Sequence, residues 1–190
     1  GITEFLPVSS TGHLIVVGNF LKFTGEKANA FEIFIQLGAI LAVVGYFRQR
    51  ILGLIQSLFS KPTPEGLSKD IAWRFTVGIG IAFIPSAVLG FLFHDSIEDR
   101  LFTPKIVALA LIVGGMAILI IERCCKNPKT LVMEQISLQK SFWIGVAQCF
   151  SLVPGMSRSA STIMGALIVG LSREAAAEFS FFLAIPTKFA

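Results

Sequence analysis

Two polar clusters interrupt apolar stretches of the chain, and both contain residue types suited to phosphate chemistry. The first cluster is PVSSTGH (7–13), preceded by Glu4, and the second is PGMSRSAST (154–162). Arg158 is the only charged residue in the apolar run around the second cluster, and an isolated arginine in such a run requires a partner. Its planar guanidinium suits a phosphate or a carboxylate. We therefore expect an anion to bind at Arg158.

The rest of the second cluster adds to this interpretation. Gly155 allows the backbone to approach a ligand closely, and the helix that follows would direct its N-terminal amides at an anion. Ser157 and Ser159 supply hydroxyl donors. Ser161 and Thr162 are expected to bond the preceding helical turn, as such residues usually do in membrane helices. The pattern predicts a phosphate cradle, although it is not a P-loop because the G-x-x-x-x-G-K-[ST] motif is missing.

The first cluster supplies the reactive groups. Glu4 can hold a divalent cation such as Mg²⁺, and His13 can transfer protons near neutral pH. Ser10 is a nucleophile if His13 is within reach, or otherwise a phosphate donor like Ser9 and Thr11. Together these groups favour metal-assisted phosphoryl transfer. Two structural alternatives stay open at this point: an ion pair between Arg158 and Glu4, and a purely interfacial place for His13.

Composition identifies the class of protein that must position these clusters. Of the 190 residues, 54% are hydrophobic and only 15% are charged, and the mean hydropathy is +0.76. A soluble enzyme, a disordered chain, a coiled coil and a disulfide scaffold are all disfavoured, and an integral membrane protein is favoured. The net charge of +4 requires no nucleic-acid partner, and three cysteines are too few for a metal or disulfide framework.

The distribution of charge predicts an all-α polytopic membrane protein. Three charge-free intervals approach the length of a bilayer span, which needs about 20 residues. They predict spans near 30–48, 72–93 and 103–122. Each polar cluster lies between two short apolar arms, which is typical of a re-entrant helical hairpin. The hairpins are expected at 1–22 and 142–171, and the next span is expected to begin within 175–190.

Charges in the connecting segments predict the orientation. The 48–74 and 122–140 segments are rich in Lys and Arg, whereas 94–100 is predicted to be an acidic loop. The positive-inside rule places the first two in the cytoplasm and the third outside. RQRILGLIQSLF (48–59) is predicted to form an amphipathic helix at the interface.

Three short matches at nearly constant offset indicate an internal duplication. GITE (1–4) resembles GVAQ (145–148), and the PVSS and FEIFIQLGAI segments have counterparts about the same distance along the chain. Because three spans separate the copies, the repeats have inverted topology, and their broken helices should meet near the midplane. We expect a first repeat over 1–144 and the start of a second over 145–190. The chain is then a fragment that lacks the C-terminal spans.

The two clusters resemble the signature motifs of one family. EFLPVSSTGH (4–13) and PGMSRSAST (154–162) are similar to those of bacterial undecaprenyl-diphosphate phosphatases of the bacitracin-resistance type, and EFSFFLAIP (178–186) resembles a third segment. The resemblance implies hydrolysis of undecaprenyl diphosphate to the monophosphate with Mg²⁺ or Ca²⁺, which recycles the lipid carrier for the cell wall. It also implies a plasma (inner) membrane location with the active site open to the periplasmic face.

The resemblance also assigns roles to individual residues. The second acid of the family's metal-binding motif falls on Glu4, the serine pair on Ser9 and Ser10, the catalytic histidine on His13, and the Ser-Arg pair on Ser157 and Arg158. The implied partners are a polyprenyl diphosphate and membrane lipids, with no nucleic acid, and a homo-oligomer is compatible with them. The alternative function is a transporter or flippase for a phosphorylated lipid, because inverted repeats with midplane breaks are typical of transporters.

Overall fold

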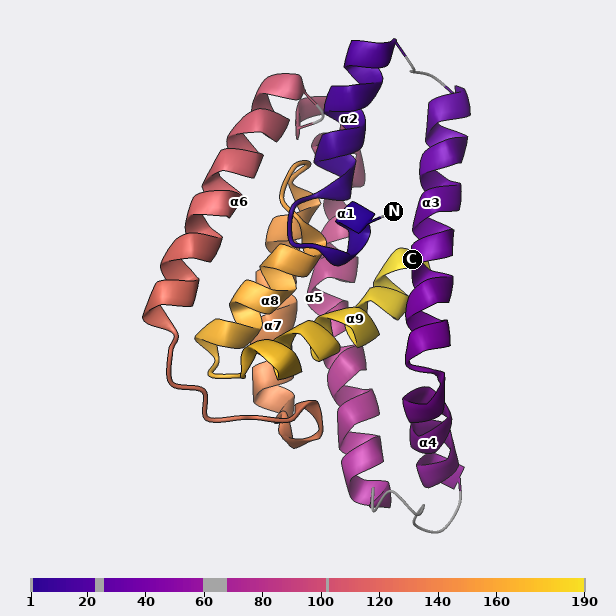
Figure 1. The fold of residues 1–190 in the computed structure, drawn as a ribbon, viewed down its shortest axis with the longest axis vertical. Coiled ribbons are helices and arrows are strands. Elements are labelled where there is room, and N and C mark those ends of the chain that lie inside the picture. Colours follow the sequence, from indigo (N-terminus) through magenta and orange to yellow (C-terminus); the bar gives the residue numbers. More distant parts are fainter. Residues whose placement is uncertain (1, 23–25, 60–67, 102, 190) are drawn as a thin grey trace.

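A computed structural model describes residues 2–22, 26–59, 68–101 and 103–189 of the chain (Figure 1). The described residues form helices and no named strand, so the prediction of an all-α protein is confirmed. The elements are α1 (Ile2–Phe5), α2 (Ser10–Leu21), α3 (Glu26–Tyr46), α4 (Arg48–Phe59), α5 (Lys69–Leu101), α6 (Pro104–Cys124), η1 (Met133–Gln135), α7 (Leu138–Gln148), η2 (Cys149–Leu152), α8 (Arg158–Ile168) and α9 (Arg173–Phe189).

Two helices in the described part of the chain are long and apolar enough to cross a membrane. They are Lys69–His94 within α5, with a mean hydropathy of 2.1, and α6, with a mean hydropathy of 2.4. A third crossing is available if Ile33–Tyr46 and Arg48–Phe59, which meet at a 68° bend, form one broken span. Large apolar side chains on α5 and α6 are exposed, as expected for helices that face lipid.

The prediction of a loop at 94–100 is wrong, because α5 continues as far as Leu101. This segment, HDSIEDR, contains neither Gly nor Pro, so nothing in it ends a helix. The chain turns only at the start of α6, where Thr103 caps the helix by accepting a hydrogen bond from the Ile106 amide and Pro104 occupies the first turn. The predicted helix at 48–59 is present as α4, while its place at the membrane interface stays a prediction.

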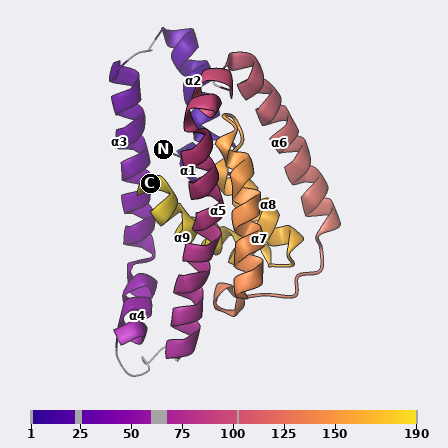
Figure 2. The same ribbon diagram turned by 180° about the vertical axis from the view of Figure 1, so that it is seen from behind.

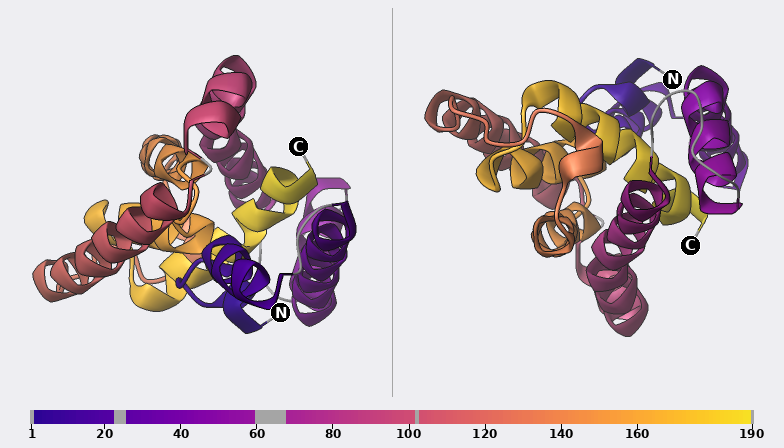
Figure 3. Two further views of the ribbon diagram at one scale, coloured as in Figure 1. Left: turned by 90° about the horizontal axis from the view of Figure 1, so that it is seen from above. Right: turned by 90° about the horizontal axis from the view of Figure 1, so that it is seen from below.

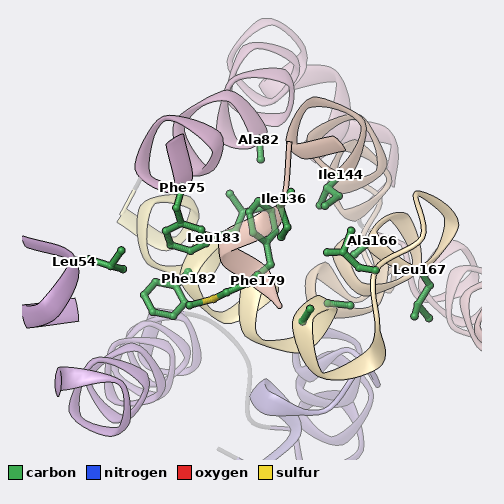
Figure 4. Close-up of a cluster of buried hydrophobic side chains, with 14 of the residues drawn as sticks. Leu54, Phe75, Ala82, Ile136, Ile144, Ala166, Leu167, Phe179, Phe182 and Leu183 are labelled. Carbon is green, nitrogen blue, oxygen red and sulfur yellow. The ribbon is translucent and has the colours of Figure 1, made fainter. Parts of the chain in front are cut away.

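The short helices α7, α8 and α9 lie between α3 and α6, which stand at opposite edges of the molecule (Figures 1 and 3). α9 runs obliquely across the bundle, and its C-terminal end lies beside α3 when the molecule is seen from the front and from behind (Figure 2). The main apolar core surrounds α9 (Figure 4). In it, the ring of Phe75 on α5 contacts Phe179 and Phe182 edge-on, with centroids 6.1 and 5.3 Å apart.

An ion-pair cluster ties α4 to this core. Arg50 donates to the carboxylate of Glu134 in η1, and its Nη1 lies 2.9 Å from Oε1 of Glu178 on α9. The Arg50 side chain is 37% exposed. The pairs fix the start of α9 relative to α4, and through α9 they orient the polar residues at its other end.

Close packing of α5 against α7 depends on a glycine. A Cβ added at Gly145 would lie 2.3 Å from the carbonyl oxygen of Ala82, which is backbone and cannot move aside as a side chain would. Gly145→Ala is therefore expected to destabilise the protein by about 1–3 kcal/mol. Gly80→Ala is the matched control, because nothing lies within 4 Å of the added Cβ there. Thermal unfolding in detergent measures both, and equal midpoints would contradict the packing argument.

Candidate functional site

The two polar clusters lie side by side in the structure. The Ser159 hydroxyl at the start of α8 donates to the Leu6 carbonyl just after α1, with 3.3 Å between the oxygens. A cavity of about 250 Å³ opens between them. Its lining comes from the first break, the second break and the end of α9: Thr3, Glu4, Ser9, Ser10, Thr11, Ser151, Leu152, Met156, Ser157, Arg158, Ser159, Thr187 and Lys188.

The first break is built around two buried serines. Ser9 has a φ of 59°, in the left-handed region that residues with a side chain seldom adopt. Its hydroxyl accepts a hydrogen bond from the Gly12 amide at 3.2 Å and so caps the start of α2. Ser9 and Ser10 are only 5% and 8% exposed. The unusual backbone turns both residues into the cavity wall instead of extending α1 into α2.

The second break presents the N-terminus of α8 to the same cavity. Ser157 caps this helix by accepting from the Ala160 amide at 3.3 Å, and its hydroxyl is 3.0 Å from that of Ser159. The unpaired amides of the first turn carry partial positive charge, which favours an anion there. The second cluster thus supplies hydroxyls, amides and one guanidinium on a single wall.

Gly155 permits a close approach to a neighbouring helix. Its φ is +97°, and a Cβ there would lie 2.5 Å from the carbonyl oxygen of Val107 on α6. The turn before α8 can therefore pack against α6. Gly155 is outside the cavity lining, and its part in phosphate binding stays a prediction.

Arg158 is held to α9 and lines the cavity. Its Nη1 donates to the Ser180 carbonyl at 2.8 Å, whereas its buried Nε has no hydrogen-bond partner in the structure. The hydroxyls of Thr162 and Ser180 are 2.6 Å apart and join α8 to α9. Ser180 is the same residue whose carbonyl accepts from Arg158. Thr162 also bonds the preceding turn of α8, as expected. The buried Ser161 hydroxyl does not, because it has no partner.

Among the described residues, Glu4 is the only carboxylate in the cavity lining. Its side chain is 8% exposed, and its Oε1 accepts a hydrogen bond from the Ser10 hydroxyl at 2.5 Å. Its other oxygen lies 3.9 Å from the Lys188 ammonium. Among the described ion pairs, Glu4 is joined to Lys188 and not to Arg158, so the alternative of a Glu4–Arg158 pair is not what the structure contains.

His13 lies outside the cavity lining, on an exposed part of α2. Its Nδ1 is 2.8 Å from the Ser9 carbonyl, which favours the tautomer with the proton on Nδ1 and leaves Nε2 to accept. The Ser10 hydroxyl bonds Glu4 and not this ring. The structure therefore brings Glu4, Ser10 and Arg158 together and leaves His13 one helical turn away, at the edge of the first cluster.

Six lining residues were not singled out from the sequence, and four of them are polar: Thr3, Ser151, Thr187 and Lys188. Lys188 and Thr187 come from the end of α9, and Ser151 comes from η2. Lys188 had a usable signal, because it is an isolated cation in the apolar run that follows Glu178, just as Arg158 is in its own run. Thr187 and Ser151 had none, since hydroxyls in such runs usually bond their own helix.

No group of three or more His, Cys, Asp or Glu side chains within the described ranges could hold a metal ion. One carboxylate is nevertheless compatible with Mg²⁺, which often takes one or two carboxylates and completes its shell with water and substrate phosphates. The donor set at Glu4 therefore fits a cation shared with a phosphate ligand and not a cation enclosed by protein.

Comparison with known proteins agrees with the motifs. The sequence model of the family described as "Bacitracin resistance protein BacA" matches residues 1–190. A protein of Caldanaerobacter subterraneus subsp. tengcongensis named "Undecaprenyl-diphosphatase" is 58% identical over all of this chain and 68% of its own length. Proteins of the same name from Thermoanaerobacter sp. (strain X514) and Ectopseudomonas mendocina are 54% and 52% identical, again over all of this chain and over 68% and 66% of their own lengths.

These matches cover both polar clusters and every helix described above. The chain spans about two thirds of the length of these relatives, and the similarity is far above the level at which only a fold is shared. The protein belongs to the bacitracin resistance protein BacA family.

Proposed function

We propose that this protein is a membrane phosphatase that hydrolyses undecaprenyl diphosphate to undecaprenyl phosphate and inorganic phosphate. The observation that carries the proposal is the convergence of Glu4 and Arg158, from two breaks far apart in sequence, on one cavity in a chain of this family. In the reaction the bond between the bridging oxygen and the terminal phosphorus breaks, and the oxygen of a water molecule ends on the released phosphate. The lipid keeps its inner phosphate.

Arg158 and the start of α8 bind the phosphates in this proposal. The guanidinium, the Ser157 and Ser159 hydroxyls and the first amides of α8 donate to phosphate oxygens, and Ser9 and Thr11 face them from the first break. Because Arg158 is already fixed by the Ser180 carbonyl, it needs little reorganisation when charge develops in the transition state.

Glu4 is the residue that would hold the cation. A bound Mg²⁺ or Ca²⁺ supplies charge neutralisation for the diphosphate. Lys188 places a second positive charge next to the same carboxylate and adds to the attraction for the diphosphate.

The geometry supports Ser10 as the group that Glu4 activates. With its hydroxyl 2.5 Å from the carboxylate, Ser10 can pass its proton to Glu4 as it attacks phosphorus, or it can orient a water molecule. His13, whose Nε2 is an acceptor, is placed to transfer a proton only at the edge of the site. The proposal therefore puts Glu4, Ser10 and Arg158 at the centre and His13 in a peripheral acid/base role.

The same proposal includes the cellular setting. The protein lies in the bacterial plasma membrane, with the cavity open to the outer face, as the resemblance to the family implies, and with the basic 122–140 segment in the cytoplasm, as the positive-inside rule predicts. The product returns to the lipid-carrier cycle for peptidoglycan synthesis, and the family description adds resistance to bacitracin to this role.

Release of phosphate tests the proposal. The natural polypeptide that carries this sequence, purified in detergent, is expected to release one phosphate per undecaprenyl diphosphate. Chelation with EDTA is expected to reduce the rate at least about a hundredfold, because the cation neutralises the diphosphate. Excess Mg²⁺ or Ca²⁺ should restore it. A preparation that is folded and metal-loaded but releases no phosphate would overturn the assignment.

A lipid transporter is the second candidate, because two broken helical segments meet at one cavity in a membrane protein. Reconstituted vesicles distinguish the two functions. Movement of fluorescent lipid diphosphate between leaflets without phosphate release would favour transport. The Glu4–Ser10 pair favours hydrolysis, since binding an anion for transport requires Arg158 and helix ends but no carboxylate bonded to a hydroxyl.

A further inference from the structure

An apolar groove lies between α3 and α9, on the side of the molecule away from α6. Its volume is about 390 Å³, and its lining consists of Ala42, Val43, Tyr46, Phe47 and Phe181. The ring of Phe47, at the 68° bend between α3 and α4, lies 4.9 Å from that of Tyr46 and 6.1 Å from that of Phe181. All five of these side chains are apolar or aromatic.

A smaller cavity of about 20 Å³ lies between this groove and the candidate active site. It shares Val43 and Phe181 with the groove. It also shares Glu4, Arg158 and Lys188 with the polar cavity. The three cavities therefore adjoin one another from charged groups to aromatic rings, and α9 contributes to the lining of each.

The outer side of α3 beside the groove is apolar and exposed. Leu41 is 61% exposed and Leu37 is 45% exposed. In a membrane protein such a surface faces lipid, so a chain lying in the groove can continue into the bilayer without passing a polar barrier. The end of α9 lies next to α3 in both views of the fold, which keeps this path short (Figures 1 and 2).

We propose that the groove binds the isoprenoid units nearest the diphosphate and that Val43 and Phe181 form the junction between tail and headgroup. This inference rests on the proposed function, because it assumes a lipid diphosphate in the polar cavity. Branched, unsaturated isoprene units suit a groove lined by rings and small aliphatic side chains.

A bulky substitution in the groove tests the proposal. Ala42→Trp fills the groove without touching Glu4, Ser10 or Arg158. We expect it to raise the KM for undecaprenyl diphosphate about tenfold or more, the usual effect of lost apolar contacts in a pocket, with little change in kcat. The KM for isopentenyl diphosphate, which is too short to reach the groove, should not change. Leu41→Trp, one residue away on the exposed side of α3, is the matched control and should leave both values unchanged.

Photocrosslinking gives a second measurement that does not depend on turnover. Benzoylphenylalanine in place of Ala42 should be labelled by radioactive undecaprenyl diphosphate, and excess farnesyl diphosphate should compete. The same group in place of Leu41 should label several-fold less. Equal labelling at both positions, or a crosslink from position 42 to another protein segment or a second copy, would overturn the groove assignment.

The two proposals fail in distinguishable ways. If the unaltered protein hydrolyses no diphosphate, the proposed function is wrong. If it hydrolyses undecaprenyl diphosphate normally and Ala42→Trp leaves the KM unchanged, only the groove assignment is wrong.

Discussion

Replacing Arg158 by alanine is expected to lower the kcat/KM for undecaprenyl diphosphate about a thousandfold, the effect usual for an arginine that stabilises a transferring phosphoryl group. The guanidinium is fixed by the Ser180 carbonyl on one side and lines the polar cavity on the other. Its removal leaves the first amides of α8 without the one guanidinium that the described lining residues supply. Phosphate release under saturating Mg²⁺ measures the effect.

Arg158→Lys is expected to restore little of this activity. A lysine ammonium is a point charge and cannot bond the Ser180 carbonyl and bind a phosphate with a planar fork at the same time.

Arg173→Ala is the matched control, because this arginine begins the neighbouring helix α9, is 71% exposed and contacts only Glu122, at 3.8 Å, among the described ion pairs. Its activity should be that of the unaltered protein. An Arg158→Ala protein that unfolds normally yet keeps more than about a tenth of the activity would contradict the role.

Arg158 and Glu4 could be found from sequence because a charge in an apolar run is costly and therefore informative. The same cost of placing a charge in the membrane explains why the helices themselves were predictable. An interval without charges that is about as long as a bilayer span indicates a transmembrane helix. α5 and α6 include the intervals predicted at 72–93 and 103–122. The inverted repeat was inferred from weak matches and stays a prediction, as does the division of the chain at residue 144.

What could not be predicted depends on how each helix is rotated and where it packs. A glycine at position 155 predicts that another group approaches the backbone closely there. The sequence does not say whether that group is a ligand or a residue of α6. His13 is close to Ser10 along the chain, yet the turn at Ser9 starts α2 so that the ring lies outside the cavity. The residues of α9 entered the site because that helix crosses the bundle, a path that no local pattern encodes (Figure 1).

Removing the charge of Glu4 is expected to produce the other large loss. Glu4→Gln keeps the size of the side chain but removes the anionic acceptor of the Ser10 hydroxyl, 2.5 Å away, and the only carboxylate that could hold a cation in the cavity lining. We expect the kcat/KM to fall about a hundredfold to ten-thousandfold, the usual contribution of a general base. Raising the Mg²⁺ concentration should not restore it. Glu174→Gln, on the exposed first turn of α9, is the control and should be fully active.

A double-mutant cycle then decides whether Glu4 and Ser10 act as one unit. If the carboxylate works through the hydroxyl, Ser10→Ala removes the same step, and the double variant is no more than about threefold worse than the worse single variant, because residues acting as a unit are strongly non-additive. This is the result we expect from a hydroxyl and a carboxylate in such close contact. Losses that multiply would instead show that Glu4 acts independently of Ser10, through the cation alone. The base that activates the nucleophile would then have to be another group, and His13 is the only remaining acid/base residue of the first cluster.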